Sequence, residues 1–181
     1  MMDNLLLILA LAARVCLGLV FVIAGVQKMR HWRILEGVIS NYRLLPFALV
    51  KPAASLLPVF ELLLGTALLA GFAPALSAAA AILLLAVFAA AMAVNIRRGR
   101  THIDCGCHQS FLRQTLSPVL VARNIILAAV LLPAALVAAP LTPAAWVVGI
   151  FTGLAFFLFY AMANVITSLP VLGNSTQEHL P

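Results

Sequence analysis

Five long apolar runs constrain this chain more than any other feature of its sequence. Each reaches the roughly 20 residues that an α-helix needs to cross a bilayer, and they cover about residues 5–27, 52–72, 74–95, 117–138 and 144–167. Charged residues make up only 9% of the 181 residues, too few to cover a soluble domain. The sequence therefore predicts an all-α, polytopic transmembrane helix bundle, one integral-membrane domain over residues 1–181. Five spans are expected, with four spans and a lid helix as the alternative.

Glycine and proline mark two of the predicted connections. The stretch from Gly71 to Pro74 divides the second run from the third, and the stretch from Ala139 to Pro143 divides the fourth from the fifth. Such residues suit tight turns, so both connections are expected to be helical hairpins. The first run has no lysine or arginine before it and is longer than the apolar part of a secretory signal. We therefore expect it to remain as the first helix.

The basic residues gather in two of the connecting segments, which two spans separate. They are Lys28, Arg30, Arg33, Arg43 and Lys51 in the first segment, and Arg97, Arg98, Arg100 and Arg113 in the third. By the positive-inside rule both segments should be cytoplasmic, including the loop over residues 97–116. The formal charge of +6 is then explained by orientation and by contact with anionic membrane lipid, and it indicates no nucleic-acid partner.

The first basic segment also carries an amphipathic pattern. Apolar and aromatic side chains recur at helical spacing from Trp32 to Leu45, and Arg33, Glu36 and Arg43 fall mostly on the other side. This pattern predicts an interfacial helix that Pro46 ends. Its role is either to anchor the chain at the membrane surface or to dock a partner.

Three charged residues lie within the apolar runs, where a charge needs a partner. Arg14 is nine residues into the first run and Glu61 nine residues into the second, which runs the opposite way. We therefore expect Arg14 and Glu61 to pair near the membrane midplane, either as a proton or substrate site or as a structural pair that fixes helix register. Arg123, near the start of the fourth run, is expected to snorkel toward the polar surface, where it would favour a thiolate.

The third connecting segment contains the sequence Cys105-Gly106-Cys107. A disulfide across one intervening residue closes a small, strained ring, and Gly106 permits the turn that such a ring demands. Strained, exposed disulfides are typically exchange-active, and the neighbouring His102 and His108 favour the attacking thiolate. These features predict a redox pair that acts without a small-molecule substrate. Cys16 lies in the first run and is predicted to be an inert, buried side chain.

A metal site is the rival interpretation of the same segment. Cys105 and Cys107 could hold a soft ion together with His102, as a copper or zinc carrier would. His108 directly follows Cys107, which is awkward geometry for one tetrahedral centre. A non-catalytic membrane scaffold is a further alternative that the residues leave open.

Several motifs together resemble one family, the MauE proteins of methylamine utilisation within the DoxX-like redox-associated membrane proteins. The resemblance covers roughly residues 14 to 130 and rests on the stretch from Arg14 to Lys28, Tyr42 through Pro46, Leu57 to Leu62 with Gly65, Arg98-Gly99, Cys105-Gly106-Cys107 and Arg123-Asn124. Many relatives continue the cysteine motif with Phe-Gly, where this chain has His108-Gln109.

The resemblance implies a multi-pass protein of the bacterial inner membrane. It implies a role in maturation, processing or export of the small subunit of periplasmic methylamine dehydrogenase, a subunit rich in disulfides, with a thioredoxin-like partner of the MauD type. By the same resemblance Cys105 and Cys107 are the redox pair, and Arg14, Lys28, Glu61 and Arg123 are family-typical positions.

The charge pattern and the family resemblance disagree about the side of the membrane on which the cysteines act. The arginines place the cysteine loop in the cytoplasm, whereas maturation of a periplasmic enzyme is simplest with periplasmic thiols. A relay across the membrane would reconcile the two, but one cysteine pair stores only two electrons. Such a relay would need the pair to move, or Cys16 or a quinone to take part. No other cofactor is expected.

Overall fold

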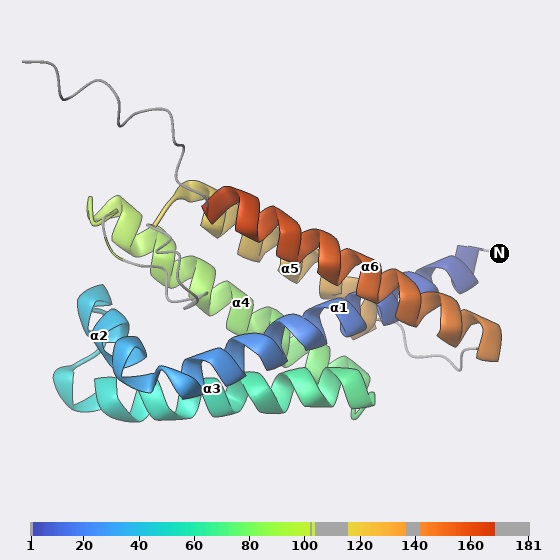
Figure 1. Cartoon of the computed structure of the whole chain (residues 1–181), viewed down its shortest axis with the longest axis horizontal. Coiled ribbons are helices and arrows are strands. Elements are labelled where there is room, and N and C mark those ends of the chain that lie inside the picture. The colour runs from blue at the N-terminus through green and yellow to red at the C-terminus, as the bar shows by residue number, and fades with distance from the viewer. Residues whose placement is uncertain (1, 102, 104–115, 137–141, 169–181) are drawn as a thin grey trace, which may run out of the picture.

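Six α-helices make up the part of the chain that the computed structural model describes, which is residues 2–101, 103, 116–136 and 142–168 (Figure 1). Five are long and apolar enough to cross a membrane: α1 (Met2–Arg30), α3 (Phe47–Ala70), α4 (Pro74–Arg97), α5 (Pro118–Leu136) and α6 (Pro143–Ser168). The sixth, α2 (Trp32–Tyr42), is short. The prediction of a polytopic helical bundle with five spans is confirmed.

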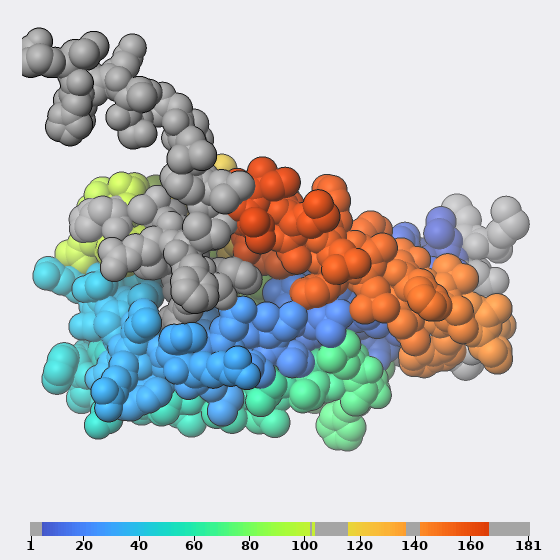
Figure 2. Space-filling view, viewed as in Figure 1, coloured from blue at the N-terminus to red at the C-terminus, as the bar shows by residue number. Residues whose placement is uncertain are grey.

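Helix α1 is the centre of the bundle. It packs against α3 on one side and against α6 and α5 on the other, while α4 packs mainly against α5 (Figure 1). On the face shown in Figure 2, α6 lies over one part of α1 and α2 covers the opposite end of the molecule. Most remaining side chains of the spans are apolar and exposed, as expected for helices that face lipid.

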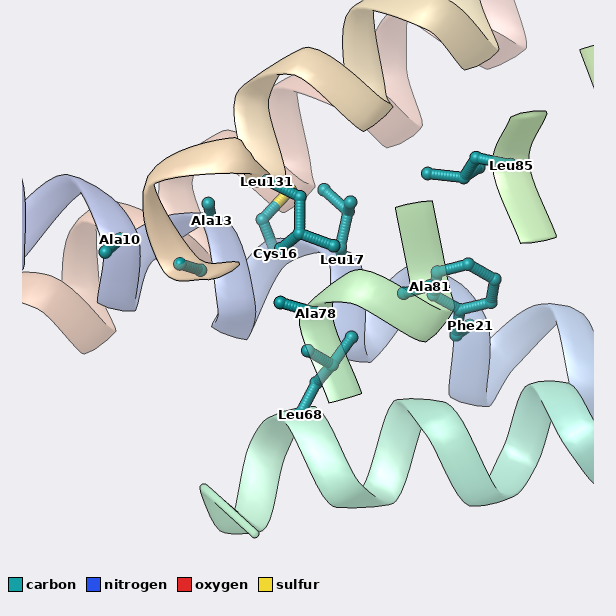
Figure 3. Packing of buried hydrophobic residues seen from close by; sticks show 11 residues of the cluster. Ala10, Ala13, Cys16, Leu17, Phe21, Leu68, Ala78, Ala81, Leu85 and Leu131 are labelled. Atoms are coloured by element: carbon teal, nitrogen blue, oxygen red, sulfur yellow. The ribbon is translucent and has the colours of Figure 1, made fainter. Parts of the chain in front are cut away.

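Small side chains let the helices approach closely in the main core (Figure 3). Ala10 and Ala13 of α1 and Ala78 and Ala81 of α4 are almost fully buried. Larger side chains fill the space between them, including Leu17, Leu68, Leu85 and Leu131. The core therefore joins α1, α3, α4 and α5 into one unit.

Glycines set the register between the antiparallel helices α1 and α3. A Cβ atom added to Gly65 would lie 2.7 Å from the Val22 nitrogen and 2.8 Å from the Gly18 oxygen. A Cβ added to Gly25 would lie 2.9 Å from the Pro58 oxygen and 3.0 Å from the Leu62 nitrogen. The two backbones therefore touch, and this contact decides which side chains of α1 and α3 face each other.

The predicted tight hairpin between α3 and α4 is confirmed. Gly71 ends α3 in the left-handed conformation, with φ of 69°. The Phe72 amide donates to the Ala67 carbonyl at 3.0 Å, which closes the last turn, and Pro74 begins α4. The predicted second hairpin, from Ala139 to Pro143, includes residues 139–141, which lie outside the described residues, and Pro143 begins α6.

Helix α2 has the predicted amphipathic character, but it ends earlier than expected. Leu35, Val38 and Tyr42 are buried, and Trp32 is 44% exposed. The helix stops at Arg43, whose φ of 47° is left-handed, rather than at Pro46. The polar backbone of the turn is satisfied there, because the Arg43 amide donates to the Ser40 carbonyl at 3.1 Å.

The two basic segments lie at the same end of the bundle. The guanidinium of Arg98, which follows α4, donates a hydrogen bond to the carbonyl of Arg43, which follows α2, at 3.5 Å. Figure 1 shows α2, the start of α3 and the end of α4 together at this end, which we call the basic end. Residues that are far apart in the sequence thus form one positively charged surface.

Candidate functional site

The predicted site residues divide into two groups. Those that lie outside the described residues are Cys105, Gly106, Cys107, His102 and His108. Those that the structure describes are Arg14, Lys28, Glu61 and Arg123. The candidate redox pair and the alternative metal ligands therefore stay predictions from the sequence.

Ile103 and Leu116 are the described residues on either side of the cysteine segment. The Leu116 amide donates to the Ile103 carbonyl at 3.1 Å, so the two ends of the segment are joined. Both side chains are buried in a cluster with Val38 and Tyr42 of α2 and Met92 of α4. The segment therefore leaves and rejoins the bundle at the basic end.

A buried ion pair joins α1 to α3. The Lys28 ammonium donates a hydrogen bond to Glu61 Oε1, and the two residues are only 4% and 1% exposed. The Phe88 ring of α4 completes the centre, with its centroid 5.3 Å from Lys28 Nζ, close enough for a cation–π contact. Three helices therefore meet around this ion pair within the spans.

The expected pair between Arg14 and Glu61 is wrong. Because Gly25 lies against Pro58 and Leu62, the residue that faces Glu61 comes from the last turns of α1, where Lys28 lies. Arg14 is about 21 Å from Lys28 along the axis of α1, at 1.5 Å per residue. The expectation assumed that the ends of the two helices are level, whereas Gly25 lies against Pro58 and Leu62, so the start of α3 extends beyond the end of α1.

Arg14 binds instead at the C-terminal end of α3. Its Nη2 donates to the Leu68 carbonyl at 3.2 Å, and a Cβ atom on Gly71 would lie 2.6 Å from the same nitrogen. The last carbonyls of a helix have no partner within the helix and carry partial negative charge. Arg14 therefore caps α3, which is a structural role for this charge.

Arg123 contacts α6 through a residue that sequence reasoning missed. Its Nη1 donates to Oδ1 of Asn164 at 2.7 Å, and Asn164 is only 5% exposed. The missed signal was an amide residue inside an apolar run, which in hydrocarbon normally has a hydrogen-bonding partner. The contact ties α5 to α6.

Cys16 lies in the main core, as predicted. Its thiol is free and the residue is 6% exposed, among the apolar side chains of α1, α4 and α5 (Figure 3). Roughly 18 Å of helix separates Cys16 from Lys28. This placement suits a small apolar side chain.

Comparison with known proteins identifies relatives over most of the chain. The family described as "Methylamine utilisation protein MauE" matches residues 6–140. The chain is 41% identical over 164 residues to the methylamine utilization protein MauE of Paracoccus denitrificans, and this match covers 87% of each protein. It is 36% identical over 170 residues to the MauE protein of Methylorubrum extorquens, which covers 91% of this chain and 90% of the relative.

A shorter match shows the highest identity of the three. The MauE protein of Methylophilus methylotrophus is 46% identical over 98 residues, which is 54% of this chain and 52% of the relative. No solved structure matches the chain significantly.

Proposed function

Because the chain belongs to the family of the methylamine utilisation protein MauE, we propose that it is an inner-membrane accessory protein of methylamine degradation. It supports maturation, processing or export of the small subunit of methylamine dehydrogenase through thiol–disulfide exchange at Cys105 and Cys107. A thioredoxin-like protein of the MauD type is its proposed redox partner. The observation that supports this most directly is a Cys-Gly-Cys motif in a chain whose family is known.

The proposed exchange proceeds in two steps. The thiolate of one cysteine attacks a sulfur of a partner's disulfide, which forms a mixed disulfide and releases a partner thiolate. The second cysteine then attacks the mixed disulfide. The partner leaves with both sulfurs reduced, and Cys105 and Cys107 are left as a disulfide, so two electrons have passed to the partner. The reverse sequence oxidises a partner dithiol.

The surroundings of the motif suit this chemistry. Arg98 and Arg100 precede it, and the basic end that its flanking residues join also carries Arg43. Positive charge near a thiol favours the thiolate, which is the nucleophile in exchange. The hydrogen bond from Leu116 to Ile103 keeps the two ends of the segment at this surface.

A double substitution tests the proposed exchange. In a strain grown on another carbon source with methylamine added as inducer, whose only copy carries Cys105→Ser and Cys107→Ser, active dehydrogenase should fall toward the level of a strain that lacks the protein. The matched control is Cys16→Ala, which removes a buried thiol and should leave maturation largely intact. Normal dehydrogenase in the double variant, at equal levels of membrane protein, would sink the proposal.

The proposed orientation is tested by thiol labelling. If the basic end is cytoplasmic, a membrane-impermeant maleimide should label Cys105 and Cys107 in inverted vesicles and leave them unlabelled in intact cells with a permeable outer membrane. Cys16 should stay unlabelled on both sides because it is buried. Labelling of the pair only in intact cells would reverse the orientation and place the exchange in the periplasm.

A further inference from the structure

A cavity of about 430 Å³ opens between α2, α3 and α4 and reaches Lys28 of α1. The lining residues come mainly from α2, α3 and α4, and Figure 1 shows α3 and α4 diverging from their hairpin toward the basic end, where α2 lies. Its volume is within the range of small-molecule sites. The described lining is apolar apart from Lys28 and the Tyr42 hydroxyl.

The mouth of the cavity faces the surface that the spans present to lipid. Leu56 and Phe60 of α3 and Val87 of α4 line it, and these residues are 58%, 60% and 54% exposed. Exposed apolar side chains in the middle of spans contact acyl chains. A ligand therefore enters from the bilayer and must itself be lipophilic.

Lys28 gives the cavity one strong hydrogen-bond donor. An ammonium has three N–H groups, and among the described residues one of them is used, by Glu61 Oε1. The charge of Lys28 is balanced by Glu61, so the site as a whole is neutral. A neutral acceptor fits this arrangement, whereas a phosphate or a carboxylate would bring an unpaired charge and would need several donors.

We propose that this cavity binds the head of a membrane quinone, with one ring carbonyl accepting a hydrogen bond from Lys28 Nζ. A quinone is neutral, its flat and largely apolar ring suits a lining that includes Phe60 and Phe88, and its isoprenoid tail can leave past the exposed side chains of Leu56 and Phe60 toward lipid. The site involves no cysteine, so a failure of the quinone-binding test can be distinguished from a failure of the thiol-exchange test.

Two neighbouring alanines of α4 provide a matched test. Ala91 lines the cavity, whereas Ala90 is exposed and does not line it. Decylubiquinone would be titrated into the purified full-length protein in detergent. Binding would be followed by the quenching of the fluorescence of the protein's 2 tryptophans. Ala91→Phe fills the cavity and should weaken binding by about ten-fold or more, while Ala90→Phe should bind as the unchanged protein does. Equal affinities for the two variants would overturn the site.

A second variant tests the hydrogen bond without leaving a buried charge. Lys28→Met combined with Glu61→Leu removes the donor and keeps the site neutral, and should weaken decylubiquinone binding about ten-fold. Phenyldecane, which has a ring and a tail but no carbonyl, should compete with decylubiquinone with the same affinity for both proteins. This comparison also decides the matter if Ala91→Phe fails to fold. Equal binding of decylubiquinone by both proteins, or no saturable binding at all, would contradict a quinone site and leave a site for acyl chains.

Discussion

Replacing Lys28 by methionine is expected to lower the free energy of unfolding by about 3–5 kcal/mol, the usual cost of removing one partner of a buried ion pair. Glu61 would remain only 1% exposed with no cation beside it, and its second oxygen, Oε2, already has no hydrogen-bond partner among the described residues. The loss should therefore exceed that of the packing around the lysine side chain. Replacing both residues, with Lys28→Met and Glu61→Leu, should restore most of the stability, because no charge is then left in the core.

The buried thiol of Cys16 offers a direct measurement of this loss. In a background with Cys105→Ser and Cys107→Ser, Cys16 is the last of the 3 cysteines, and it reacts with a maleimide only when the core opens. The reaction would be followed against urea concentration in detergent. The control is Lys51→Met, because Lys51 is exposed on α3 and its loss should change stability by no more than about 0.5 kcal/mol. If the single and double variants were equally destabilised, the lysine and the glutamate would not be acting as a pair.

The spans could be predicted because each corresponds to an uninterrupted apolar run of the sequence. An apolar run of sufficient length defines a span without knowledge of its neighbours, and Gly71 with Pro74 marks a turn by local chemistry alone. The residues at which the helices begin and end were less predictable. Helix α1 continues to Arg30 because basic residues suit the last turn of a helix, and α3 already begins at Phe47 and continues through Pro52.

The partners of the charged residues could not be predicted in the same way. A partner depends on how far one helix is shifted along another, and here the backbone contact at Gly18, Gly25 and Gly65 sets that shift. With this register Glu61 meets Lys28, and Arg14 reaches the end of α3. The two glycines of α1 and the one of α3 were the available signal, since small residues in spans mark close helix contacts.

The observations that support the chemistry of the cysteine motif are different from those that support the geometry around it. Residue type, spacing and family membership indicate thiol exchange at Cys105 and Cys107. The structure adds where the segment is attached, through Ile103 and Leu116, and what lies at that end of the bundle. The apolar cavity beside Lys28 was invisible in the sequence, because its lining comes from four helices that only the fold brings together.

Replacing Gly65 by alanine is expected to destabilise the bundle by about 1–3 kcal/mol, because the added methyl group would overlap atoms of the α1 backbone. The nearest are the Val22 nitrogen at 2.7 Å and the Gly18 oxygen at 2.8 Å. No side-chain rotation relieves a backbone contact, so α1 and α3 must separate. That separation would also disturb the ion pair between Lys28 and Glu61, which the same register brings together.

Gly37 provides the matched control for this substitution. It is also a helical glycine, in α2, but a Cβ atom there would meet nothing within 4 Å. Alanine is the better helix former by about 1 kcal/mol, so Gly37→Ala should leave stability unchanged or raise it. The two substitutions are chemically identical, and opposite shifts in the urea midpoint of Cys16 labelling would therefore isolate the contact between α1 and α3. A Gly65→Ala variant as stable as Gly37→Ala would mean that this contact does not hold the register, and that the ion pair itself aligns the two helices.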